Sequence, residues 1–209
     1  MSFTLNEILH ETGQILLIPC LAILVFFIIA SIWEVGTVIV EFLVEHRKMQ
    51  EDVPLLLQNI HNHGKEELGS LIENSKLLQS QKSAALELIK NADMPKESLV
   101  ALARTLLGNL EGNYMRNTRL TDYIIKLGPM FGLLGTLIPL GPGIVALGQG
   151  DTGTLSISMS TAFDTTIAGV ITGAVCFVVS KIRKRWYDTY IDSMEAIMEC
   201  IIQEVLEND

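Results

Sequence analysis

A single carboxyl group lies within the longest apolar segment of this chain. Asp164 stands in the stretch Thr152 to Ser180, which contains no other charged residue. Even lenient insertion scales put the cost of a charge in hydrocarbon near 3 kcal/mol, so such a residue normally faces a bundle interior or a watery cavity. A carboxyl in that setting can take up and release a proton, which predicts a place on an ion path. The alternative is a packing role in which neighbouring threonine hydroxyls cap the carboxyl.

Hydroxyl side chains accompany Asp164 at the same depth. Thr136 lies near the middle of another apolar stretch, Leu127 to Gly150, as Asp164 does in its own. A helix turns about 100° per residue, so Asp164 and Thr166 lie about 200° apart and cannot both face one lumen from one subunit. We therefore expect a ring of subunits to complete the path. The predicted ion-path residues are Thr136, Thr161, Asp164, Thr165 and Thr166.

Three apolar stretches must position these groups. Residues Thr12 to Trp33 form the first, and Leu127 to Gly150 and Thr152 to Ser180 the others; none contains Lys or Arg. Each exceeds the roughly 20 residues that cross a bilayer core. The first lacks a basic leader and a small-residue cleavage site, so it is expected to be retained. The sequence predicts an all-α integral membrane protein with three transmembrane helices and cytoplasmic helical extensions.

The positive charges predict the orientation in the membrane. All 15 Lys and Arg residues fall between Arg47 and Lys126 or between Lys181 and Arg185. Basic segments near span ends stay on the cytoplasmic side. We expect a multi-pass protein of the cytoplasmic (inner) membrane with its N-terminus outside and its C-terminus in the cytoplasm.

The polar residues between the first two spans predict a cytoplasmic helical domain. Helix breaks are expected at Pro54, at Asn62-His63-Gly64, at Ala92 to Pro95 and at Gly108. Apolar residues recur every three or four positions, as in helices that pack on a partner. The expected domains are residues 1–45 (outer N-terminus, first span and its extension), 46–119 (cytoplasmic helices), 120–182 (second and third spans, the ion-path module) and 183–209 (cytoplasmic C-terminal helix).

Several classes of function find no support in the sequence. A net charge of −9 argues against a nucleic-acid partner. The juxtamembrane cations Lys181, Arg183, Lys184 and Arg185 are expected to anchor a span at lipid headgroups. No catalytic nucleophile motif, phosphate loop or paired carboxylates appear, so no enzyme and no cofactor is predicted. His61 and His63 flank Asn62 without metal-site surroundings, and no metal is expected.

The second span is far richer in Gly and Pro than spanning requires. Gly128, Gly132 and Gly135 follow a small-residue spacing that lets neighbouring helices touch. Pro139 and Pro142 are expected to loosen the backbone toward the outer end of the span.

These residues resemble the MotA/TolQ/ExbB proton-channel family. The second span of that family carries Pro-x-x-Gly-Leu-hydrophobic-Gly-Thr, and the motif residues here are Pro129, Gly132, Leu133, Gly135 and Thr136. Its third span carries a Thr followed three residues later by Gly and an aliphatic residue, to which Thr166, Gly169 and Val170 are similar. The resemblance covers about Leu120 to Arg185 by motif, and three spans are like TolQ and ExbB.

The resemblance implies a proton-channel or stator subunit of an ion-motive-force-driven membrane motor. It implies a homopentamer whose pore encloses the single spans of two partner subunits resembling ExbD or TolR. Thr136 and Thr166 correspond to the family's pore-lining hydroxyls. One departure is Thr161, because the most similar members carry a Glu there, whereas Asp164 is the only carboxyl of this span. The alternative function is a non-conducting membrane scaffold whose Gly-rich spans serve assembly.

Overall fold

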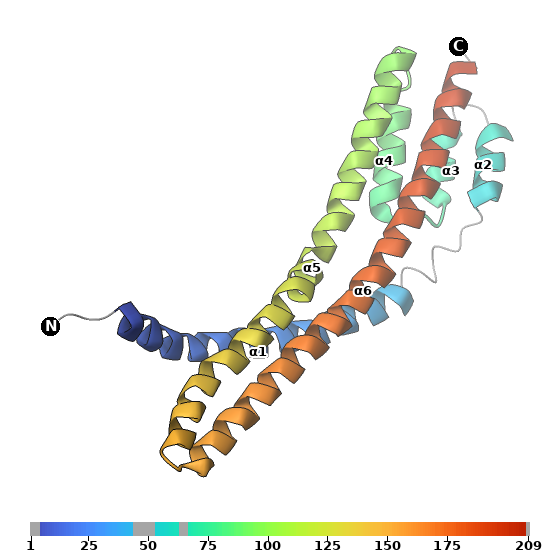
Figure 1. Cartoon of the computed structure of the whole chain (residues 1–209). Helices are drawn as coiled ribbons and strands as arrows, with labels where there is room; N and C mark the ends of the chain where they lie inside the picture. Colours follow the sequence, from blue (N-terminus) through green and yellow to red (C-terminus); the bar gives the residue numbers. More distant parts are fainter. Residues whose placement is uncertain (1–4, 44–52, 63–66, 208–209) are drawn as a thin grey trace. The chain divides into compact units, whose positions relative to one another are not determined.

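The computed structural model describes residues 5–43, 53–62 and 67–207 and builds them from helices without any strand in those ranges (Figure 1). This confirms the all-α fold class. The helices are α1 (Leu5–Glu41), α2 (Val53–Asn62), α3 (Leu68–Asn74), α4 (Gln79–Lys90), α5 (Lys96–Gly148) and α6 (Thr152–Glu207).

Three helices are long and apolar enough to cross a membrane. The candidate spans lie in Thr12–Glu41 of α1, in Lys96–Gly148, which is all of α5, and in Thr152–Leu206 of α6. Each contains one of the apolar stretches found in the sequence, so the prediction of three transmembrane helices is confirmed. Both α5 and α6 are much longer than the roughly 20 residues that a bilayer core needs.

The chain divides into two compact units, and each has its own interior. The first unit comprises Met1–Thr37 and Arg119–Lys181, and the second comprises Val38–Thr118 and Ile182–Asp209. In the first unit, α1, α5 and α6 meet around a small apolar cluster. Its buried residues are Phe27, Ala30, Ile124 and Cys176. The ring of Phe27 packs edge-on against Phe131, with centroids 5.9 Å apart.

A larger core holds the second unit together. It joins α2, α3 and α4 to the parts of α5 and α6 that belong to this unit. The stripes with helical spacing supply most of it, which confirms the predicted helix packing. Its buried residues include Leu68, Ile72, Leu88, Leu99, Leu106, Leu110, Met194, Ile197, Ile201 and Val205.

The helix boundaries match some of the predicted breaks and correct one. Residues 91–95 do separate α4 from α5, and α2 ends at Asn62; His63 and Gly64 lie outside the described residues. The predicted break at Gly108 is wrong, because α5 continues through it. One glycine costs a helix only about 1 kcal/mol relative to alanine. Burial of Leu106 and Leu110 in the core of the second unit offsets that cost.

A short turn joins α5 to α6. Gly150 has a φ of 81°, a left-handed conformation that glycine adopts without strain. Asp151 then caps α6: its Oδ1 accepts a hydrogen bond from the Thr154 backbone N–H at 3.0 Å, and its Oδ2 accepts one from the Thr154 hydroxyl at 2.5 Å. The hydroxyl bond, followed by the backbone bond, lowers the pKa of Asp151 below its ordinary value.

This cap predicts a pH dependence of stability. A carboxyl whose pKa is lowered by folding stabilises the folded state above its ordinary pKa, and that contribution is lost as the pH falls through the lowered value. The thermal midpoint of the parent in micelles should therefore decrease between about pH 5 and pH 2. Asp151→Asn keeps a cap acceptor but cannot titrate, so this part of the decrease should vanish. Circular dichroism at each pH measures it, and identical profiles for the two proteins would contradict the cap.

Candidate functional site

A seam of small residues brings α5 and α6 together in the first unit. A β-carbon added at Gly132 would lie 3.1 Å from the Thr165 carbonyl oxygen and 3.3 Å from the Cα atom of Gly169. One added at Gly169 would lie 2.8 Å from the Cα of Gly132 and closer still to the carbonyl oxygen of Gly128. The two backbones are therefore in direct contact. We call Gly128, Gly132, Gly135, Gly169 and Gly173 the glycine seam.

The motif residues lie along this seam. The Pro129 ring packs against Gly173, where an added β-carbon would lie 3.1 Å from the proline Cδ. Gly135 faces the side chain of Thr165, whose Cβ would be 2.7 Å from a β-carbon at that glycine. Gly173 was not among the predicted site residues, although its position four residues after Gly169 puts it on the same helix face.

Two threonines of α6 point into the seam. Thr165 and Thr172 are buried, and their hydroxyls donate to carbonyls of their own helix: Thr165 to Ala162 at 2.9 Å, and Thr172 to Ala168 at 2.8 Å. Such bonds satisfy a hydroxyl in apolar surroundings. In the single protomer, Thr165 thus packs against α5.

Asp164 directly precedes the buried Thr165 in α6, but Asp164 itself is exposed on the surface of the protomer. Thr161 is half-buried and donates to the carbonyl of Ile157 at 3.1 Å. Thr166 is half-buried and lies beside Gly132. A β-carbon added at Gly132 would lie 3.4 Å from the Cα atom of Thr166. The protomer therefore separates Asp164 from Thr166, as the 200° between them requires.

Thr136 is half-buried on α5, directly after a seam glycine. Its hydroxyl donates to the carbonyl of Leu133 at 2.6 Å. The hydroxyl oxygen keeps its acceptor lone pairs available for a water or a second donor. The close contact at Gly135 fixes the backbone beside Thr136, so the seam positions this hydroxyl.

Two further polar contacts lie within the first unit and were not predicted. The Ser180 hydroxyl donates to Oδ1 of Asp122 at 2.9 Å, which joins α6 to α5. The Cys20 thiol donates to the carbonyl oxygen of Phe131 at 3.3 Å, which joins α1 to α5. The partners are far apart in sequence, so no local spacing marks them.

One of the four juxtamembrane cations expected to anchor the span at lipid headgroups is buried inside the second unit instead. Lys181, Lys184 and Arg185 are exposed, as lipid anchors should be, but Arg183 is buried. Its Nε lies 2.9 Å from Oε2 of Glu41, and both side chains are largely hidden, with 7% and 13% exposed. A buried charge needs such a partner, so Arg183 is part of the protein interior.

The described residues contain no group of three or more His, Cys, Asp and Glu side chains that could hold a metal ion. His61 is largely exposed, and its Nδ1 lies 3.3 Å from Oε2 of Glu204. His63 lies outside the described residues.

The fold and the seam define a class of protein: a multi-pass membrane protein whose second and third long helices form a tight hairpin with polar groups near mid-span. The sequence profile of the MotA/TolQ/ExbB proton channel family matches residues 71–196, which is more than half of the chain. The chain belongs to this family. Comparison with curated proteins and with solved structures gave no match.

Proposed function

We propose that this chain is the channel-forming stator subunit of an ion-motive-force-driven membrane motor. Membership of the proton channel family supports the proposal. The observation that carries it is the arrangement on the hairpin: a carboxyl exposed on a spanning helix at Asp164, with Thr136 and Thr166 placed by the glycine seam. A charge exposed on a span is costly in lipid, so a second subunit or water must cover it.

In this proposal the path is completed by assembly. Neighbouring copies in a homopentamer cover Asp164, and the pore-facing hydroxyls of Thr136 and Thr166 line the lumen. Thr161 lies one turn from Asp164 on the same face, where it extends the polar surface. Thr165 packs against Gly135 in the protomer, so its part in the path is to fix the backbone next to Asp164.

The proposed partner is a dimer of single-span subunits resembling ExbD or TolR, held in the central pore. The proposed site is the inner membrane, with the N-terminus outside and the C-terminus in the cytoplasm, because the basic residues cluster in the segments assigned to the cytoplasm. The proposed activity of the chain is the passage of ions coupled to movement, and it involves no catalysis.

Partner-dependent proton flux into vesicles tests the function. Asp164→Asn and Thr136→Val should each reduce flux at least about tenfold, since a positioned proton-transfer group typically contributes about 10²–10⁴-fold. Asp151→Asn is the matched control, because it removes a carboxylate from the turn and should leave flux unchanged. If both span variants conduct as well as a conducting parent, the assignment of Asp164 and Thr136 to the path fails. If the assembled parent itself conducts no protons, the scaffold alternative holds.

A further inference from the structure

Glu34 places a second carboxyl inside a spanning helix. It belongs to the candidate span of α1 and to the first unit, and only 7% of the residue is exposed. It follows the buried Ala30 by one turn, on the face of α1 that packs against the rest of the unit. An ionisable side chain within a span is costly, and such residues mark routes for ions or protons. The path through Asp164, Thr136 and Thr166 gives Glu34 no role.

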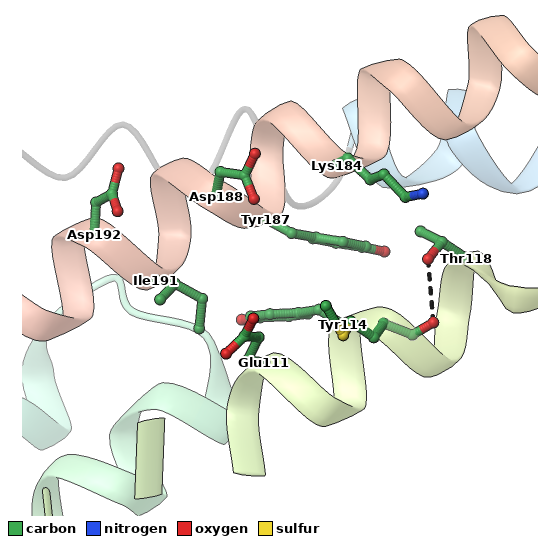
Figure 2. Close-up of a pocket in the computed structure, with 9 residues that line it drawn as sticks. Glu111, Tyr114, Thr118, Lys184, Tyr187, Asp188, Ile191 and Asp192 are labelled. Atoms are coloured by element: carbon green, nitrogen blue, oxygen red, sulfur yellow. Dashed lines mark hydrogen bonds between the residues drawn. The ribbon is translucent and has the colours of Figure 1, made fainter. Parts of the chain in front are cut away.

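The carboxylates around the cavity of the second unit are in a different setting. Figure 2 shows this cavity of about 300 Å³ between α5 and α6, where the rings of Tyr114 and Tyr187 lie face to face with centroids 4.6 Å apart. The carboxylates that line it, those of Glu111, Asp188 and Asp192, are exposed. Water stabilises their charge directly, so their position calls for no ligand and no path.

A groove in the first unit leads from Asp164 to the level of Glu34. It lies between α1 and α6 and has a volume of about 480 Å³. Its lining on α6 runs from Ala168 to Val175, and Asp164 stands one turn before Ala168 on the same helix face. Its lining on α1 ends at Val35, which adjoins Glu34 in the chain. The groove therefore connects the levels of the two carboxyls.

Two hydroxyl groups line the groove between these levels. Ser31 on α1 and Thr172 on α6 are buried, and each donates to a carbonyl of its own helix, Ser31 to that of Ile28 at 2.8 Å. Each hydroxyl oxygen keeps acceptor lone pairs for water. The groove has room for several water molecules, each of which takes about 30 Å³ in the liquid. Its remaining lining is apolar, so the hydroxyls are the groups that can hold water there.

The distance between the carboxyls requires such water. Asp164 and Val175, which marks the level of Glu34, are about 16 Å apart along α6. A proton passes directly only between groups within hydrogen-bond reach, about 3 Å, so water must carry it over the rest of the distance.

Polar side chains continue from Glu34 to the end of the span that carries Lys181. The Glu34 carboxylate lies close enough to act electrostatically on the Cys176 thiol of α6, which is fully buried. Ser180 follows Cys176 by one turn, is buried, and donates to Oδ1 of Asp122 on α5 at 2.9 Å. The titratable and charged groups on the two facing helices are Cys176 and Lys181 on α6 and Asp122 and Lys126 on α5, and both lysines are exposed.

We propose that Glu34 is a second proton-binding carboxyl of this chain, which receives protons from the level of Asp164 through the groove and releases them toward the cytoplasm. A proton carried by water binds the Glu34 carboxylate, which leaves a water molecule and a neutral carboxylic acid. Release of the proton to water on the far side restores the carboxylate, and no electron is transferred. This inference rests on the proposed channel function and adds a residue of α1 to its path.

Glu34→Gln tests proton binding, because glutamine keeps the shape of the side chain but cannot take up a proton in this way. Partner-dependent flux into vesicles should fall at least about tenfold, as expected for the loss of a positioned proton-transfer group. Glu34→Asp keeps a carboxyl and should retain more flux than Glu34→Gln. If the parent conducts and Glu34→Gln conducts equally well, this inference is wrong and the channel proposal stands. If the parent conducts no protons, both fail.

Infrared difference spectra between neutral and acidic buffer follow the carboxyl without any need for flux. Uptake of a proton produces the C=O stretching band of a neutral carboxylic acid. One component of this band in the parent should be shifted in Glu34→Asp and lost in Glu34→Gln, while Asp151→Asn should leave that component in place. Spectra of both Glu34 variants that match the parent would show that Glu34 exchanges no proton with water, which overturns the inference.

Thiol labelling tests whether the groove holds water or a lipid chain. A charged, water-soluble thiol reagent attacks only a thiolate that water reaches. Ser31→Cys should be labelled at least about fivefold more than the parent, which keeps its native cysteines. Ile29→Cys, on an exposed part of the same span outside the groove, is the matched control and should react no more than the parent. Equal labelling of the two variants would assign the groove to lipid and exclude the path to Glu34.

Discussion

Gly169→Ala is expected to force α5 and α6 apart and to lower the free energy of unfolding by about 3 kcal/mol, the upper part of the range for overpacking. The added methyl group meets backbone atoms of Gly132 and Gly128, with the Cα of Gly132 only 2.8 Å away. Backbone cannot rotate out of the way as a flexible side chain can. The strain therefore cannot be relieved without moving a whole helix.

Gly36→Ala, in α1 of the same unit, is the matched control. Nothing lies within 4 Å of a β-carbon at Gly36, and no proline adjoins it in the chain, so the same chemical change meets open space there. It should leave stability unchanged or raise it slightly, because alanine is the better helix former. Equilibrium unfolding in mixed micelles measures both variants. Equal stability of Gly169→Ala and the parent would show that the seam is not a backbone contact.

The seam also links stability to the proposed ion path. Gly135 precedes Thr136, and Gly132 contacts the backbone at Thr166, so both hydroxyls stand on the closest part of the hairpin. A shift of one helix past the other would move both groups relative to the lumen. The glycines that pack the hairpin thus also set the position of the polar groups proposed to guide protons.

The membrane architecture could be predicted from the sequence because it depends on local composition. Three apolar runs of sufficient length without Lys or Arg mark the spans, and the Gly-rich motif marks the hairpin contact. The sequence could not show which of the adjacent residues Asp164 and Thr165 is buried against α5 and which is exposed. Adjacent residues on a helix are only about 100° apart, so which of them faces α5 depends on the rotation of the helix. The structure buries Thr165 and exposes Asp164.

The pairing of side chains that lie far apart in the sequence could not be predicted either. Glu41 and Arg183 are 142 positions apart, and nothing local distinguishes Arg183 from the exposed cations beside it. Its place in a basic cluster favoured a lipid-facing role. Only the approach of α1 to α6 in the second unit shows that Arg183 has a buried carboxylate to meet.

Breaking this pair is the second large effect expected. Arg183 Nε donates to Oε2 of Glu41 at 2.9 Å, and the Tyr187 hydroxyl donates to Oε1 of the same carboxylate at 2.8 Å. Burial, followed by the bond to Glu41, raises the pKa of Tyr187, so the phenol keeps its proton. Arg183 Nη1 also donates to the carbonyl oxygen of Asn117 at 3.4 Å. The network ties α1, α5 and α6 together in the second unit.

Arg183→Met should lower the free energy of unfolding by about 3–5 kcal/mol, because it leaves a largely buried carboxylate without its cation. Tyr187→Phe removes one hydrogen bond to a charged group and should cost about 1.5–3 kcal/mol. Arg185→Met removes an exposed cation two residues away and should change stability by no more than about 0.5 kcal/mol. Chemical unfolding of the three variants in micelles gives this order.

The double variant Glu41→Leu with Arg183→Met separates pairing from packing. Replacing both partners of a buried ion pair with apolar side chains is often neutral or stabilising, whereas removing one is costly. The double variant should therefore be more stable than Arg183→Met alone, with a coupling of about 0.5–3 kcal/mol between the sites. If the two single losses simply add, Arg183 contributes through its own contacts and the ion pair does not hold the helices together.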